Sequence, residues 1–161
     1  MKQTTSQSTD LLREILAHPA RGVAGLVDEL LLVCWKHDLE LDWRPECLRV
    51  RSRGGDWEES SGTRVRPSVF RAILARMAVL CNEFKHSHSE PEPVSPYGAD
   101  RVTTFAITTP DSMACLLEGG DSADSSARVE TPIEFNVQFS NTAGSQSLKL
   151  WRRDSLPIDG S

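Results

Sequence analysis

The sequence contains one close pair of histidines, His86 and His88, followed by the carboxylates of Glu90 and Glu92. Imidazole and carboxylate groups are ligands that zinc and other transition metals take in proteins, and a bound metal can activate water for hydrolysis. The pair lies beside a proline-rich segment and has no further histidine near it, which favours an ordinary solvated loop. We therefore predict no metal site, and a small metal-dependent hydrolase that uses His86 and His88 is kept as an alternative.

Three arginines, Arg49, Arg51 and Arg53, alternate along a strand-like run. Residues two apart on a strand point to the same face, so three guanidinium groups would lie together. Guanidinium groups bind phosphates and carboxylates, which makes this face a candidate site for phosphate or for an acidic partner. The competing interpretation is a solvated sheet face that is balanced by acids on neighbouring strands. Those acids are Glu40, Asp42 and Asp56. No aromatic residue interleaves with the arginines in the sequence, which argues against nucleic acid.

Standard catalytic signatures are absent from the sequence. The chain has no Gly-x-x-x-x-Gly-Lys-Ser/Thr phosphate loop, no Gly-x-Gly-x-x-Gly, no His-Glu-x-x-His and no Gly-x-Ser-x-Gly. Without a phosphate loop, the chain has no recognisable means of holding a triphosphate by itself. We predict no catalytic residues and no cofactor.

The four cysteines, Cys34, Cys47, Cys81 and Cys115, are far apart and form no Cys-x-x-Cys pair. Such spacing is typical of small buried hydrophobic residues in a reducing compartment, with a catalytic thiol as the alternative. The polar first nine residues lack the apolar core of a signal peptide. We therefore expect a cytoplasmic protein.

Composition indicates one soluble domain in 161 residues, with 39% hydrophobic and 25% charged residues and a formal net charge of −5. Residues 1–80 carry 12 Lys and Arg against 11 Asp and Glu, whereas residues 81–161 carry 6 against 12. This distribution argues against a cationic nucleic-acid binder and suits a protein partner. No apolar run is long enough to span a membrane, so we expect no membrane insertion. A homo-oligomer stays compatible with these features.

Apolar residues at helical spacing predict three helices, over residues 10–17, from Val23 to about His37, and from Pro67 to about Phe84. Alternating residues predict strands instead, and prolines predict a loop over 85–99. The predicted strands are 39–44, 48–53, a short strand that begins at Trp57, 102–108, 113–117, 133–139 and 147–151. Helices and strands that are segregated in this way predict an α+β fold, with a mostly antiparallel sheet and helices packed on one face. We assign residues 10–153 to this single domain, with an acidic flexible loop at about 119–130, a disordered tail at 1–9 and a C-terminal tail at 154–161.

Three segments follow one another in a recognisable order: 23–42 (VAGLVDELLLVCWKHDLELD), 48–56 (LRVRSRGGD) and 70–80 (FRAILARMAVL). This order resembles the second N-terminal domain of type II secretion and type IV pilus assembly ATPases. In that family a helix leads into a short strand, and a basic strand with an acidic turn comes before a second helix. Pro96-Tyr97-Gly98 stands where the family has a Pro-Gln-Asp-Gly-Arg loop, and Gly144 to Arg152 is similar to its closing strand.

The resemblance implies a bacterial protein-interaction or regulatory domain that works with a secretion or pilus ATPase. Family arginines approach the nucleotide held by the ATPase domain, and Arg76 falls on the first such position, while 85–91 carries no arginine at the second. Because the phosphate loop is missing, we expect a diverged, standalone relative without the ATPase domain. Arg49, Arg51, Arg53 and Arg76 are the predicted partner or phosphate contacts. A domain that senses a small ligand or nucleotide is a further alternative.

Overall fold

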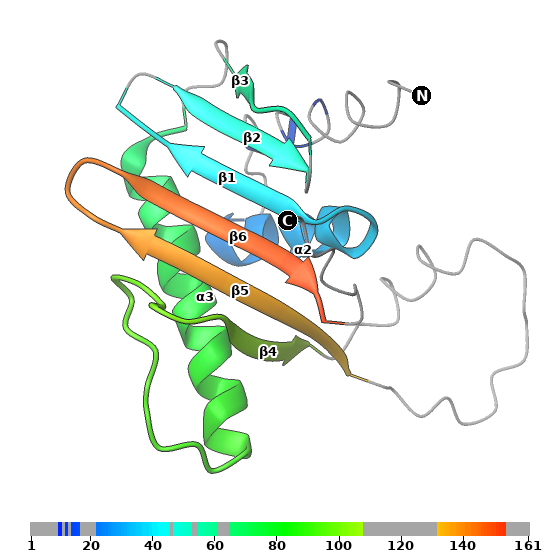
Figure 1. Cartoon of the computed structure of the whole chain (residues 1–161), viewed down its shortest axis with the longest axis vertical. Coiled ribbons are helices and arrows are strands. Elements are labelled where there is room, and N and C mark those ends of the chain that lie inside the picture. The colour runs from blue at the N-terminus through cyan, green and yellow to red at the C-terminus, as the bar shows by residue number, and fades with distance from the viewer. Residues whose placement is uncertain are drawn as a thin grey trace, which may run out of the picture.

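The computed structural model describes residues 10, 12, 14–16, 22–45, 47–52, 55–60, 65–107 and 132–153. Within these residues, two long helices and six strands follow one another along the chain (Figure 1). In order they are α2 (Gly22–Lys36), β1 (Leu39–Trp43), β2 (Leu48–Ser52), β3 (Glu58–Ser60), α3 (Pro67–Ser87), β4 (Thr103–Ile107), β5 (Ile133–Asn141) and β6 (Gln146–Arg152).

The six strands form one sheet in the order β3-β2-β1-β6-β5-β4, and every neighbouring pair is antiparallel. The last strand, β6, lies in the middle, where it pairs with both β1 and β5. This arrangement joins the first three strands to the last three in a single sheet. It confirms the predicted α+β fold with an antiparallel sheet.

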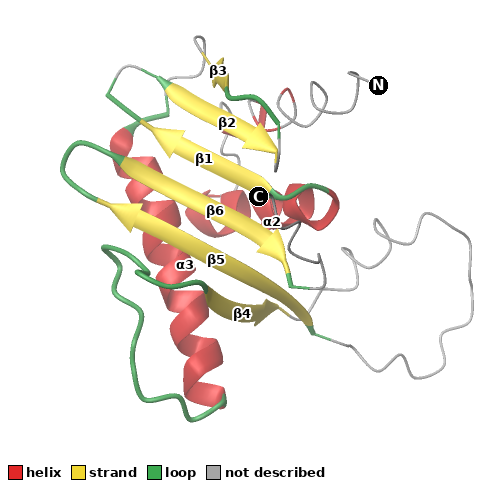
Figure 2. Cartoon of the chain, viewed as in Figure 1, coloured by secondary structure: helices red, strands yellow, loops and turns green. Residues whose placement is uncertain are grey.

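Both helices pack on the same face of the sheet, as Figure 2 shows. Alternation along each strand explains this, because one set of side chains is apolar and buried and the other is polar. On β1, for example, Leu39, Leu41 and Trp43 are buried, whereas Glu40 and Asp42 between them are half-buried. We call the face that carries Glu40 and Asp42 the outer face. Among the described residues, no helix covers it.

The helices bury the apolar stripes that their spacing predicts. On α3 these residues include Phe70, Ile73 and Met77, none of which is exposed to solvent. Pro67 occupies the start of α3, where its missing N–H and fixed φ fit the first turn. Leu12 and Leu16, from the segment predicted as a short helix, are buried in the same core.

Most element boundaries lie within one residue of the sequence predictions, and the larger differences are at the ends of α3 and β5. Helix α3 continues to Ser87 rather than ending near Phe84, so the predicted loop begins one helical turn later. The third strand begins at Glu58, one residue after Trp57, and β5 continues to Asn141. The predicted tails, the acidic loop at 119–130 and the predicted strand at 113–117 lie outside the described residues. In the part of the chain that is described, no helix is both long and apolar enough to cross a membrane.

Candidate functional site

The outer face holds the two arginines of β2 that the structure describes, each beside an acid on β1. Arg51 lies directly opposite Glu40, and its Nε and Nη2 atoms donate to Glu40 Oε2 at 2.9 and 2.7 Å. Arg49 lies opposite Asp42, with 3.7 Å between Nη1 and Oδ2. The arginine face is therefore balanced by neighbouring acids, as the competing interpretation expected. Arg53 lies outside the described residues.

Trp57 stacks against both arginines. The guanidinium carbons of Arg49 and Arg51 lie 4.8 and 4.4 Å from the centre of the indole ring. With an acid on one side and an aromatic ring on the other, the two side chains are only 27% and 30% exposed. We call these three residues, with Glu40 and Asp42, the arginine clasp. The attraction between a cation and the ring face holds the guanidinium planes in fixed positions.

Sequence reasoning missed Trp57 as part of this cluster, although a signal for it existed. Strand β3 pairs with β2 so that Glu58 lies opposite Val50 and Glu59 opposite Arg49. One more step of the same register places Trp57 beside Arg51, on the outer face. Hairpin register, rather than spacing along one strand, would have revealed the contact.

Arg76 lies apart from the clasp. It belongs to α3, which packs on the opposite face of the sheet from Arg49 and Arg51. The sheet therefore separates the two predicted groups of contacts, and one flat partner surface cannot touch both.

The other half of the outer face carries Lys149 and Trp151 on β6. Lys149 is exposed and lies opposite Glu40 on one side and Gln138 on the other. A shallow depression of about 200 Å³ is lined by these side chains together with half-buried Trp151. Among the described residues, Lys149 has no ion-pair partner, because Glu40 pairs with Arg51.

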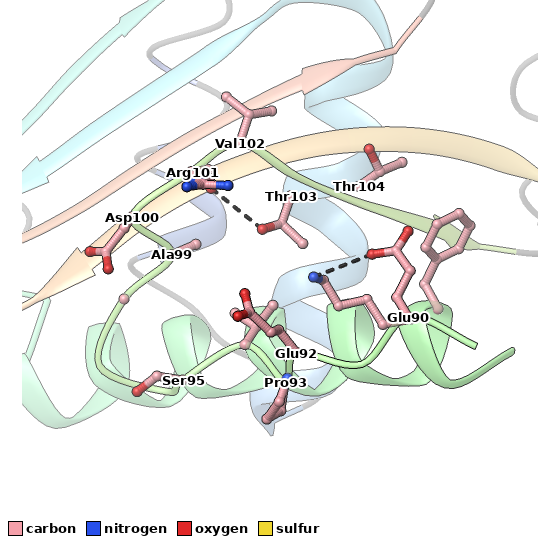
Figure 3. Close-up of a pocket in the computed structure, with 14 residues that line it drawn as sticks. Glu90, Glu92, Pro93, Ser95, Ala99, Asp100, Arg101, Val102, Thr103 and Thr104 are labelled. Atoms are coloured by element: carbon pink, nitrogen blue, oxygen red, sulfur yellow. Dashed lines mark hydrogen bonds and ion pairs between the residues drawn. The ribbon is translucent and has the colours of Figure 1, made fainter. Parts of the chain in front are cut away.

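A larger cleft of about 530 Å³ lies where the end of α3 faces the start of β4. Figure 3 shows the loop before β4 closing this cleft, with Glu92 pointing toward the segment that carries Arg101 and Thr103. Lys85 also lines the cleft and pairs with Glu90 at 3.3 Å. The volume falls within the range of small-molecule sites, so the ligand-sensing alternative stays a prediction.

The loop that closes the cleft is fixed at both ends. On the helix side, Asn82 Nδ2 donates to the carbonyl of Val94 at 3.0 Å, and the Val94 N–H donates to Asn82 Oδ1 at 2.6 Å. On the sheet side, the N–H of Ala99 donates to Phe139 O, and the N–H of Asn141 donates to Tyr97 O. Gly98 lies so close to β5 that an added Cβ would approach Phe139 O at 3.3 Å. These contacts preform the cleft.

The two histidines do not form a ligand pair. His86 lies in the last turn of α3, and His88 caps that helix, its ring stacked on Phe84 with 4.1 Å between ring centres. His88 Nδ1 also lies 2.8 Å from the carbonyl oxygen of Phe84. Within the described part of the chain, no group of three His, Cys, Asp or Glu residues could hold a metal.

The described cysteines are free thiols, and two of them are deeply buried. Burial raises the pKa of Cys81 from 9.0 to about 12, although Lys85 acts in the opposite direction. Burial also raises the pKa of Cys34, and the negative charge of Asp38 adds to the effect. A raised pKa disfavours the reactive thiolate. Cys47 is half-buried, and Cys115 lies outside the described residues.

Comparison with known proteins gives no family for this chain. No protein-family model matches the sequence, and no curated protein matches it either.

Proposed function

We propose that this chain is a non-catalytic protein-interaction domain, and that its partner is a secretion or pilus ATPase subunit that docks on the outer face. The observation that supports the proposal most strongly is this face itself, which no described helix covers. The buried apolar side chains of the strands turn toward the helices, so the outer face is not needed for the described core. The order of elements that resembles the second N-terminal domain of those ATPases suggests the kind of partner.

The outer face has the chemistry of a protein-binding surface. Trp151 offers an aromatic ring beside the exposed ammonium group of Lys149, and tryptophan is enriched among residues that dominate binding energies. The arginine clasp is already ordered, so little side-chain freedom is lost when a partner covers it. Lys149 suits an acidic patch on the partner.

The test is a calorimetric titration of the purified chain with the secretion and pilus ATPase subunits of its own organism. Lys149→Glu should weaken binding at least tenfold, because it reverses the one charge of this face that is exposed and unpaired within the described residues. Arg71→Glu is the matched control, since Arg71 is exposed on α3, on the other side of the sheet. It should change the affinity less than twofold. Absence of binding, or equal loss in both variants, would reject the proposal.

A further inference from the structure

The edge of the sheet at β4 is chemically unlike the edge at β3. Strand β3 has three residues, two of which are glutamates, and short charged edges resist pairing with other chains. Strand β4 reads Thr-Thr-Phe-Ala-Ile and contains neither a charge nor a proline. In the part of the chain that is described, β4 pairs only with β5, and no strand pairs with its other edge. Among the described residues, the edge at β4 therefore lacks the usual protection against strand addition.

The register of β5 shows which backbone groups this edge presents. Successive residues of an antiparallel strand direct their N–H and C=O groups to alternate sides. Phe139 accepts a hydrogen bond from Ala99, so Phe139 and every second residue before it, including Phe135, face the β4 side. Phe135 lies opposite Phe105, which therefore faces β5. It follows that Thr104 and Ala106, its two neighbours on β4, direct their backbone groups away from β5.

The cleft continues from this edge. Thr103 and Thr104 form its wall on the strand side, and Phe84 and Lys85 form its wall on the helix side. A chain that paired with β4 would direct alternate side chains toward this space. Because the loop before β4 is pinned by Asn82, the receiving groove exists before anything binds.

The charged residues that line the cleft indicate which kind of side chain it favours. After Lys85 and Glu90 have paired, the lining carries Arg101, Glu92 and Asp100. None of these three has an ion-pair partner among the described residues, and together they leave one negative charge. The carbonyl end of the α3 dipole adds negative potential at the same place. A basic side chain is therefore favoured.

From these observations we propose that β4 and the adjoining cleft bind an extended peptide segment that carries a lysine or arginine. The peptide adds a strand to the edge at Thr104 and Ala106, and its basic side chain enters the cleft near Glu92. This is the β-augmentation mode of peptide recognition, in which main-chain hydrogen bonds give affinity and a neighbouring pocket gives specificity. The site lies at the β4 end of the sheet, at the opposite end from β2 with its arginine clasp and two strands from Lys149 on β6, and it goes beyond the function proposed above.

The test is a selection of phage-displayed random dodecapeptides on the full chain, followed by anisotropy titrations of the enriched peptides. Enriched sequences should combine β-branched residues with lysine or arginine.

Ala106→Pro removes an N–H from the free edge and should weaken peptide binding at least tenfold, whereas Ala106→Val keeps this N–H and should change the affinity less than twofold. Glu92→Lys should weaken binding at least fivefold. Its control, Glu83→Lys, reverses an exposed charge of α3 outside the cleft and should have no effect.

Three outcomes would overturn the inference. They are a selection that enriches no peptide, enriched peptides that bind Ala106→Pro as tightly as the wild type, and full displacement of the peptides by millimolar free lysine. The last result would indicate a site for a small amino acid instead. Circular dichroism and melting of each variant identify any that fail to fold, and Glu92→Lys still tests the site if the proline variant is one of them. Because no ATPase takes part, failure here is distinct from failure of the proposed docking on the outer face.

Discussion

Trp57 is the residue that does most to hold the side chains of Arg49 and Arg51 in place. Its ring covers both guanidinium groups on the side away from Glu40 and Asp42. Without the ring, the arginines would be mobile side chains in water, with ion pairs that contribute little to stability. In the arginine clasp the Trp57 ring holds both guanidinium groups in place, and Glu40 and Asp42 nearly neutralise their charge.

Replacing Trp57 by alanine should lower the free energy of unfolding by about 1–2 kcal/mol, because two cation–π contacts and part of a half-buried ring are lost. Trp57→Phe keeps a ring and should lose less than half as much. Urea denaturation followed by far-ultraviolet circular dichroism measures both variants. Equal destabilisation by alanine and phenylalanine would show that the ring does not hold the arginines.

The buried thiol of Cys81 should make stability fall in alkaline solution. In the unfolded chain this thiol ionises at its ordinary pKa of 9.0, whereas in the fold its pKa is about 12. Between these values the unfolded state binds fewer protons, so raising the pH favours unfolding by about 1.4 kcal/mol per pH unit. The contribution is fully present below pH 9 and is lost progressively above it.

The measurement is urea denaturation at several pH values from 8 to 10.5, for the wild type and for Cys81→Ala. The alanine variant starts less stable but should lose stability less steeply above pH 9. Parallel curves for the two proteins would contradict the role of Cys81. The same burial predicts that Cys34 and Cys81 react with a thiol reagent at pH 8 only after unfolding.

At the scale of elements, one amide side chain fixes the helix side of the segment between α3 and β4. Asn82 donates to and accepts from the backbone of Val94, which is buried. Asn82→Ala should cost about 2–3 kcal/mol, because it leaves a buried N–H and a buried carbonyl without partners. Hydrogen exchange of residues 92–99 should accelerate at the same time. Glu83→Ala, an exposed neighbour on the same helix, should change stability by less than about 0.5 kcal/mol.

The elements themselves were largely predictable from the sequence. The stripe that includes Leu30 and Leu31 on α2, and the alternation of Phe135, Val137 and Phe139 on β5, reflect one buried face each, and both predictions are confirmed. The end of α3 was not predictable in the same way. Its last turn is polar, and local contacts of Ser87 and His88 with the carbonyl of Phe84 extend the helix.

At the scale of the whole molecule, α2, α3 and strands from both halves of the chain share one hydrophobic core. A shared core predicts a single cooperative unfolding transition. Leu30→Ala on α2 and Phe135→Ala on β5 should each cost about 2–5 kcal/mol, since both side chains are almost fully buried. Circular dichroism and tryptophan fluorescence should report the same midpoint in each variant. Val79→Ala, which is 44% exposed on α3, is the control and should shift the midpoint little.

Sheet order is the feature of the whole molecule that local patterns could not supply. The alternation on β6 predicts a strand but contains no information about its neighbours, and it is long-range pairing that places β6 between β1 and β5. That placement sets Lys149 opposite Glu40, and it leaves β4 at the edge beside the end of α3. Neither the outer face nor the cleft could therefore be assembled from the sequence alone.

The sequence by itself determined the fold class and which side of each element is buried, because hydrophobic periodicity acts locally. For Arg49 and Arg51 the sequence left two interpretations open, and the pairing with acids on the adjacent strand is the one that the ion pairs to Asp42 and Glu40 bear out. Only the tertiary structure decided that Trp57 holds those arginines, that Arg76 lies across the sheet from them, and that the loop before β4 closes a cleft. These relations join residues that are distant in the chain, and they depend on register and packing.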